Sequence, residues 1–196
     1  MTPAEIITLA RTHFGELTAL TVSVASARSY LNAAIKELYE DLPVDRLKPL
    51  LNDEAISLTA GKGDIPSDLD RVVEVYVDNI PAVAVPREVI TTSDYGNLFA
   101  PAFPVIHIDS SHIWVRPVST NTVAITYLQA PAVITSDNEG SEITEIPVPF
   151  HESLSYLVAS YMYAQEEDVQ QAQWYRNEYM NRLMSLSQQA VAEDGQ

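Results

Sequence analysis

The segment from residue 150 to residue 165 reads FHESLSYLVASYMYAQ. Its apolar residues recur at the spacing of one helix face, i, i+3, i+4, i+7 and i+8; they are Leu154, Leu157, Val158, Tyr161 and Met162. This spacing predicts a core-facing helix over 150–165. An apolar stripe of this width must be shielded from water by other helices. The fold therefore depends on which other segments of the chain form helices that pack against it.

Two segments outside this helix show the same helical periodicity. After the acidic break Glu166-Glu167-Asp168, which supplies a capping residue and acids that favour a helix start, residues 169–189 predict the last helix. Near the other end of the chain, residues 23–41 carry apolar side chains spaced three and four apart and stop before Pro43. We therefore expect the N-terminal and C-terminal helices to pack together.

The first residues predict one more helix. Thr2 and Glu5 are spaced as a capping box, Pro3 stands where helices accept proline, and Gly15 ends the segment.

The middle of the chain changes from helical to strand periodicity. A hairpin is indicated at 105–108 and 112–115 around a turn at 109–111, and residues 122–128 alternate as a third strand. These strands predict a small antiparallel meander. The predicted fold is α+β: a helical bundle from N- and C-terminal helices with an inserted small antiparallel β meander. We expect a single domain over 1–196, with bundle helices at about 3–51 and 150–190, a β insertion at 55–130, a loop at 131–149 and a flexible tail at 191–196.

Composition and charge exclude several classes of protein. The 196 residues are 46% hydrophobic, and 11 basic against 27 acidic residues give a net charge of −16. Because nucleic-acid affinity comes mainly from clustered cations, a nucleic-acid-binding role is disfavoured. No stretch approaches the ~18 apolar residues of a membrane helix, and the N-terminus has no basic leader. Without cysteine, the chain has no disulfide, thiolate metal site or cysteine nucleophile.

Motif searches predict no catalytic residue, no metal site and no cofactor. His107 and His112 are expected to face each other across the hairpin, and packing or surface positions are favoured over a metal site for them. His151-Glu152 begins like a zinc-protease motif, but Ser155 stands where the second histidine would be. Aromatic residues gather in the last two helices, where core packing is favoured over a protein interface; they are Tyr156, Tyr161, Tyr163, Trp174, Tyr175 and Tyr179.

Several passages together resemble a known family. They are IPVPFHESLSYLVASY at 146–161, EEDVQQA at 166–172, Trp174-Tyr175-Arg176, the helix at 26–41 and IPSDLDRVVEV at 65–75. This order of a proline-led entry, a helix, an acidic break and a last helix with an aromatic and an arginine resembles the head-to-tail adaptor (connector) proteins of tailed bacteriophages. Residues 1–20 depart from the family pattern as an extra helix.

The resemblance implies a non-enzymatic structural virion protein of the neck, made in the host cytoplasm and placed at the portal vertex. It would form a ring of twelve copies that binds the portal protein and a tail (nozzle, stopper or tube) protein. DNA would pass through the ring during ejection without specific binding, and no membrane would be involved. The acidic composition is consistent with a channel along which DNA slides.

The resemblance also suggests two sets of site residues. The candidates for portal contact are Arg182, Leu186, Gln189 and Val191. The candidates for the channel or the tail-facing rim are Asp137, Glu139, Glu142 and Glu145.

Two alternatives remain open. A tail terminator or stopper also forms a ring but is richer in β structure. A small ligand-binding or enzymatic domain would instead show a deep pocket with convergent polar groups and perturbed pKa values.

Overall fold

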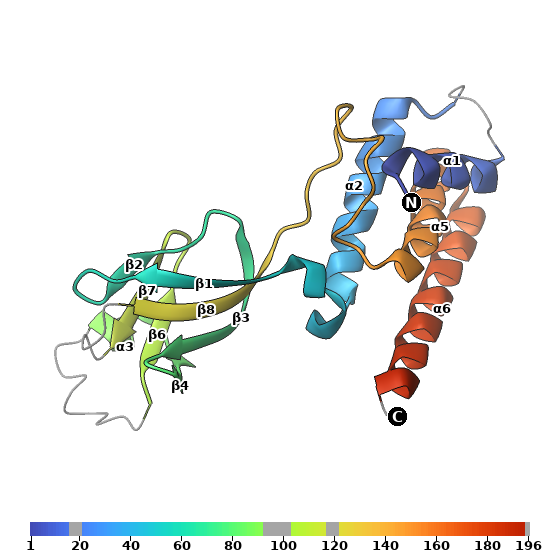
Figure 1. Ribbon diagram of the computed structural model, residues 1–196. Coiled ribbons are helices and arrows are strands. Elements are labelled where there is room, and N and C mark those ends of the chain that lie inside the picture. Colours follow the sequence, from blue (N-terminus) through green and yellow to red (C-terminus); the bar gives the residue numbers. More distant parts are fainter. Residues whose placement is uncertain (16–20, 92–102, 117–121, 195–196) are drawn as a thin grey trace. The chain divides into compact units, whose positions relative to one another are not determined.

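The computed structural model describes residues 1–15, 21–91, 103–116 and 122–194, with side chains to Leu186 in the last segment. The chain forms two compact units. The first, here called the helical unit, comprises Met1–Pro49 and Pro131–Gln196, and the second, the β unit, comprises Leu50–Ala130. The helices at both ends of the chain therefore share one unit, and the strands between them form the other (Figure 1).

The described helices of the first unit are α1 (Pro3–Phe14), α2 (Val24–Asp41), α5 (Val148–Gln165) and α6 (Val169–Asp194). Two 3₁₀ turns, η1 (Val44–Arg46) and η2 (Lys48–Leu50), follow α2. All four helices coincide closely with segments predicted from the sequence, α1 from its capping residues and the other three from periodicity. The last helix continues to Asp194, past the end at about 190 that the sequence suggests.

The helix ends are formed by the predicted residues. The Thr2 hydroxyl accepts from the Glu5 N–H at 3.2 Å while the Glu5 carboxylate accepts from the Thr2 N–H at 2.8 Å, which completes the capping box. Gly15 ends α1 at a φ of 78°, a conformation that glycine adopts without strain. The Asp168 carboxylate accepts from the Gln171 N–H at 3.1 Å and caps α6.

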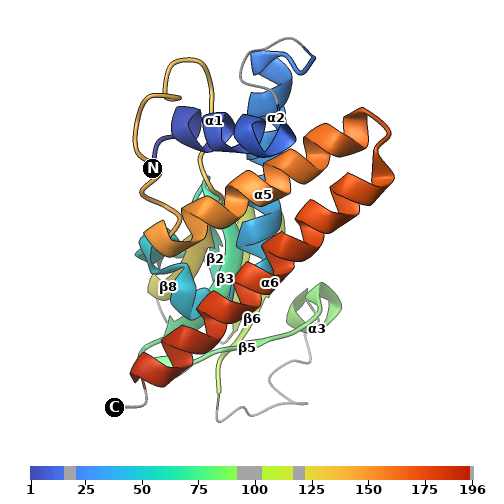
Figure 2. The same cartoon turned by 90° about the vertical axis from the view of Figure 1, so that its right-hand side faces the viewer.

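Helix α5 lies at the centre of the helical unit. It packs against α1, α2 and α6, and Figure 2 shows it side by side with α6. Small residues such as Ser153, Ala159 and Ser160 are buried in it, so neighbouring helices can approach closely on more than one side. The predicted stripe is part of this core, since Leu154, Leu157, Val158 and Met162 are all fully buried.

The β unit contains two four-stranded sheets. One has the order β1-β8-β3-β4 and the other the order β2-β7-β6-β5. The strands are β1 (Leu51–Ser57), β2 (Lys62–Asp64), β3 (Leu69–Val77), β4 (Ile80–Pro81), β5 (Val83–Ala84), β6 (Val105–Ile108), β7 (His112–Arg116) and β8 (Thr122–Gln129). A short helix, α3 (Arg87–Thr91), follows β5. All strand pairs are antiparallel except β5–β6.

The sheets confirm the α+β class but correct the predicted meander. The hairpin β6–β7 forms as expected, with Ile108 opposite Ile113. However, β8 does not add to β7; it lies in the other sheet, between β1 and β3. Alternation predicted that this segment is a strand but not which strands lie beside it, because alternation carries no information about pairing partners. Buried residues from both sheets, among them Val75, Ile113 and Ile125, form one hydrophobic cluster.

The loop at 131–147 is fixed to the helical unit. The Asn32 amide donates to the Ile134 carbonyl at 3.0 Å and accepts from the Ile134 N–H at 2.7 Å. The Ala4 N–H donates to the Glu139 carbonyl at 3.1 Å, and Ile143 is buried. This acidic loop is therefore an ordered part of the surface near α1 and α2.

Candidate protein interface on the helical unit

The solvent-facing side of α6 carries very little charge. Among Val169–Leu186 the exposed residues are Val169, Gln170, Gln171, Gln173, Trp174, Arg176, Asn177, Met180, Asn181, Met184 and Ser185. We call this set the outer face of α6; Arg176 is its one charged member. Such a face is unusual in a chain of net charge −16. Its composition is typical of protein interfaces, which are depleted of acidic residues and enriched in aromatic residues, methionine and arginine.

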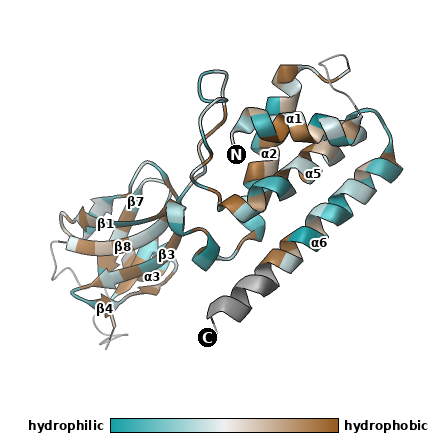
Figure 3. Ribbon diagram, turned by 45° about the vertical axis from the view of Figure 1, so that its right-hand side comes forward, coloured by the Kyte–Doolittle hydropathy of each residue, from teal (hydrophilic) through white to brown (hydrophobic). Residues whose placement is uncertain are grey.

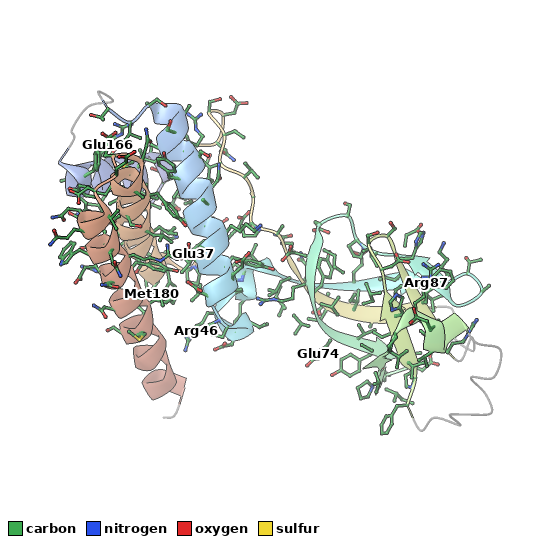
Figure 4. All side chains as sticks on the ribbon, turned by 180° about the vertical axis from the view of Figure 1, so that it is seen from behind. Glu37, Arg46, Glu74, Arg87, Glu166 and Met180 are labelled. Carbon is green, nitrogen blue, oxygen red and sulfur yellow. The ribbon has the colours of Figure 1, made fainter. Side chains whose placement is uncertain are left out.

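Large apolar side chains are exposed on this face. Trp174 is 51% exposed, Met180 41% and Met184 53%. Figure 3 shows hydrophobic positions along α6 among hydrophilic and intermediate ones, and Figure 4 labels Met180. Met180 and Met184 are four residues apart and so lie on the same side of the helix. The outer face can therefore insert bulky, adaptable side chains into a partner surface.

The opposite side of α6 is anchored to the rest of the helical unit. The fully buried Tyr179 donates its hydroxyl to the Asp41 carboxylate at 2.9 Å, and burial raises the pKa of this phenol further above 10.0. The Tyr175 hydroxyl donates to the His13 carbonyl at 2.7 Å. These contacts to α1 and α2 fix the rotation of α6 and so define which residues face solvent.

A second set of anchors surrounds Glu37 on α2. Its carboxylate accepts the Tyr161 hydroxyl at 2.6 Å and is also paired with the Arg176 guanidinium. Burial, together with the bond to Glu37, raises the pKa of Tyr161 to about 12. One carboxylate of α2 therefore links α5 and α6.

The aromatic residues of α5 and α6 pack mainly on one another. The rings of Tyr163 and Tyr175 stack with centroids 5.3 Å apart, and His13 stacks on Tyr156 at 4.4 Å. Trp174 differs, because it contacts Tyr175 edge-on at 4.7 Å while half of its surface stays exposed. Most of the aromatic set thus follows the predicted core packing, and Trp174 belongs to the outer face.

The predicted portal-contact residues all lie in the C-terminal half of α6, with Arg182 near the middle of the helix. Arg182 is turned toward α5, where its guanidinium pairs with Glu152 at 2.9 Å, donates to the Tyr156 hydroxyl at 2.8 Å and lies over the Tyr156 ring. Leu186 is half-buried. The backbone of Gln189 and Val191 continues α6, and their side chains lie outside the described residues.

The four predicted acidic residues lie on one loop of the helical unit, in two environments. Glu139 pairs with Arg28 at 2.5 Å, and the Glu145 carboxylate accepts the Ala132 N–H at 2.8 Å, so both are engaged within the chain. Asp137 and Glu142 are exposed. Two of the four acidic residues on the loop are therefore exposed to solvent.

Sequence reasoning missed the outer face of α6 as a site. No motif or periodicity in the sequence points to Met180 or Met184, and the clustering of aromatic residues favours core packing over an interface for Trp174. The available signal was the composition of residues 169–186, which hold a single acidic residue, Glu178, in a strongly acidic chain.

The two hairpin histidines do not face each other as expected. His107 is opposite Trp114, two residues beyond His112, because the β6–β7 register centres the turn one residue later than the predicted pairing requires; His112 is opposite Asp64 on β2. The His107 ring bonds to the Val85 carbonyl at 3.1 Å. Within the described residues there is no group of three or more histidine or acidic side chains placed to hold a metal ion.

The tight turn of this hairpin is organised by Asp109. Its carboxylate accepts the Ser111 N–H at 2.9 Å, the His112 N–H at 2.8 Å and the Trp114 indole N–H at 3.2 Å. The bond from Ser111, followed by those from Trp114 and His112, holds the pKa of this carboxyl well below 3.8. The Asp109 carboxylate therefore serves to close the turn.

A groove of about 590 Å³ runs along the β unit. Its lining comes from β3, the β4–β5 region and β6, and is mainly aliphatic. Glu74, Tyr76 and His107 supply its titratable groups, and the Tyr76 hydroxyl is already bonded to Glu74 at 2.9 Å. The groove thus combines strand edges and apolar side chains with few polar groups.

These features favour a protein that works through contacts with other proteins, with a charge-poor helix face as its candidate interface. Among the described helices, none is both long enough and apolar enough to span a lipid bilayer. The family model described as SU10 adaptor protein matches residues 1–195, so the chain belongs to this family of phage head-to-tail adaptors. No curated protein matches the chain.

Family membership confirms the predicted resemblance and settles the coarse function. The chain is a phage adaptor, and adaptors of this kind are structural proteins rather than a class of enzyme. Membership also implies contacts with phage portal and tail proteins and a place in the virion neck.

Proposed function

We propose that this adaptor forms a ring of twelve copies below the portal, joins the capsid to the tail and lines the channel through which DNA leaves. The observation that carries the proposal is the charge-poor outer face of α6 on an otherwise acidic chain. A strongly acidic protein that assembles with other copies or with acidic partners needs at least one surface with few acidic residues, because like charges that face each other oppose association.

In this proposal the C-terminal half of α6 contacts the portal, through Leu186, Gln189 and Val191 in its last turns and through Arg182, which precedes them and lies against α5. Its support is the anchoring described above: Tyr179 and Leu183 are buried, so the helix is fixed to the bundle before its last turns. A helix that is held rigidly at one end presents its other end to a partner at little cost in conformational entropy.

The acidic loop is proposed to face the channel or the tail-facing rim. Asp137 and Glu142 are exposed, and with Glu139 and Glu145 they place four carboxylates on one ordered loop. Twelve copies at −16 each would surround the DNA with like charge, which repels phosphates and keeps DNA from adhering to the wall.

Truncation after Ser185 tests the portal contact. We expect the shortened chain to lose only the helical far-UV circular dichroism of residues 186–194 and to keep cooperative unfolding, but to lose co-sedimentation with portal rings from the same phage. Val133→Ser, which changes a residue 67% exposed on the loop, is the matched control and should bind as the full chain does.

Light scattering of the full chain mixed with portal rings gives the stoichiometry, with one adaptor per portal subunit expected. If the truncated chain still binds the portal, the proposed contact is wrong. If the full chain ignores portal rings but binds a tail-tube protein, the stopper alternative replaces the adaptor ring.

A further inference from the structure

A second charge-poor surface lies on α2. Three of its exposed residues, Ala25, Ser29 and Ala33, are spaced four apart, so they lie in one row along the first half of the helix. We call this row the outer face of α2. All three side chains are small and uncharged, and the first exposed charges on α2 are Lys36 and Glu40. The row is therefore a shallow strip into which larger side chains of a partner can pack.

The outer faces of α2 and α6 are two separate surfaces of the helical unit, each on its own helix. Both helices pack against α5. The buried residues of α2 are Ala27, Leu31, Ala34, Ile35, Leu38 and Tyr39, and Ala27, Leu31 and Ala34 face away from the exposed row. Each outer face is thus turned away from the shared central helix.

We propose that the outer face of α6 in one copy packs against the outer face of α2 in the next copy. The inference rests on the proposed function and names the contact by which the ring closes. Because two different surfaces of one chain meet, the contact is heterologous, and repetition around an axis produces a ring instead of a dimer.

Size and charge both favour a second copy as the occupant of the α6 face. The bulky side chains Trp174, Met180 and Met184 meet a row of alanine and serine, as large residues pack onto small ones at helix contacts. Two copies at −16 each repel one another, so they associate where both surfaces lack acidic groups. Both outer faces meet that condition.

Cysteine cross-linking tests the contact, because the native chain has no cysteine. The double variant Ser29→Cys/Met184→Cys is treated with a short bismaleimide, alone at high concentration and bound to portal rings. Each copy then carries one reactive site on each face. We expect a ladder of dimers, trimers and higher species on denaturing gels, whereas either single variant can give dimers at most.

A charge substitution supplies the matched control. Met184→Glu adds a carboxylate to the outer face of α6, and Val83→Glu adds one to a β-unit side chain of nearly equal exposure, 53% against 51%. In the background Ser29→Cys/Met180→Cys, we expect Met184→Glu to lower the yield of trimers and larger species about tenfold. Val83→Glu should leave the ladder unchanged.

The outcomes separate this inference from the proposed function. If the double variant co-sediments with portal rings but gives no ladder, the adaptor function stands and the α6–α2 contact is wrong. A cross-link from Met184→Cys to a portal subunit, in place of a ladder, assigns the outer face of α6 to the portal and also overturns the inference. If the chain does not bind portals, the proposed function fails, and the ladder from the isolated chain decides the contact by itself.

Discussion

His13 lies on α1, and its side chain contacts both α5 and α6. Its ring stacks on Tyr156, is tilted against Tyr175 at 5.7 Å, and has Arg182 and Glu152 as charged neighbours. Burial, with the repulsion of Arg182, lowers the pKa of His13 below 6.5, while Glu152 acts in the opposite direction. The folded protein therefore binds fewer protons at this site than the unfolded chain when the pH falls below about 6.5.

The sign of this effect gives a prediction for His13→Phe. Because a lowered histidine pKa destabilises the fold as pH falls, the native protein should lose thermal stability between about pH 7.5 and pH 5.5. Phenylalanine keeps the stacking and removes the titration. We expect thermal unfolding of His13→Phe to depend less on pH over this interval, and an unchanged pH dependence would contradict this account.

His151 serves as the internal reference for this measurement. It is buried, its ring bonds to the Ile146 carbonyl at 2.7 Å, and burial lowers its pKa as well. Some pH dependence of the same sign should therefore survive in His13→Phe.

Tyr179 gives a second prediction at the residue scale. Its hydroxyl bonds to Asp41 while its ring is fully buried, so Tyr179→Phe removes one hydrogen bond and little packing. We expect the free energy of unfolding to fall by about 1–2 kcal/mol, measured by urea denaturation. Tyr76→Phe, whose hydroxyl is exposed and bonds to nearby Glu74, is the control and should change stability by much less.

Within the β unit, the packing of β2 on β1 depends on the absence of a side chain at Gly63. A Cβ there would lie 2.6 Å from Ile56 Cγ2 and 2.8 Å from the Ser57 carbonyl oxygen, closer than such atoms approach. We expect Gly63→Ala to destabilise the β unit by about 1–3 kcal/mol in urea denaturation. Gly140→Ala is the comparison, because a Cβ at Gly140 meets nothing within 4 Å; equal effects of the two substitutions would refute the explanation.

Helices were easier than strand pairings to predict from this sequence. The capping residues Thr2 and Asp168 and the stripe on α5 are local signals, and each forms as expected. The position of β8 between β1 and β3 could not be predicted, because its partners are far away in the chain and alternation does not identify them.

At the scale of the whole molecule, the division into two units is directly testable. Leu51 on β1 is paired with Leu128 on β8, so the chain enters and leaves the β unit through adjacent strands. We expect replacement of residues 51–129 by a short glycine–serine linker to leave a helical unit that unfolds cooperatively, measured by circular dichroism. Loss of the helical signal would support the single domain predicted over 1–196, which otherwise stays a prediction.

The sequence by itself determined the helices, their caps, the α+β class and the adaptor family, because these follow from local periodicity and from motifs read along the chain. Only the tertiary structure decided which side of α6 faces solvent. Arg182, a predicted portal contact, is turned onto α5, whereas Met180 and Met184 lie outside. The physical reason is that Tyr175 and Tyr179 bond to groups on α1 and α2, more than a hundred residues away, and these contacts set the rotation of the helix.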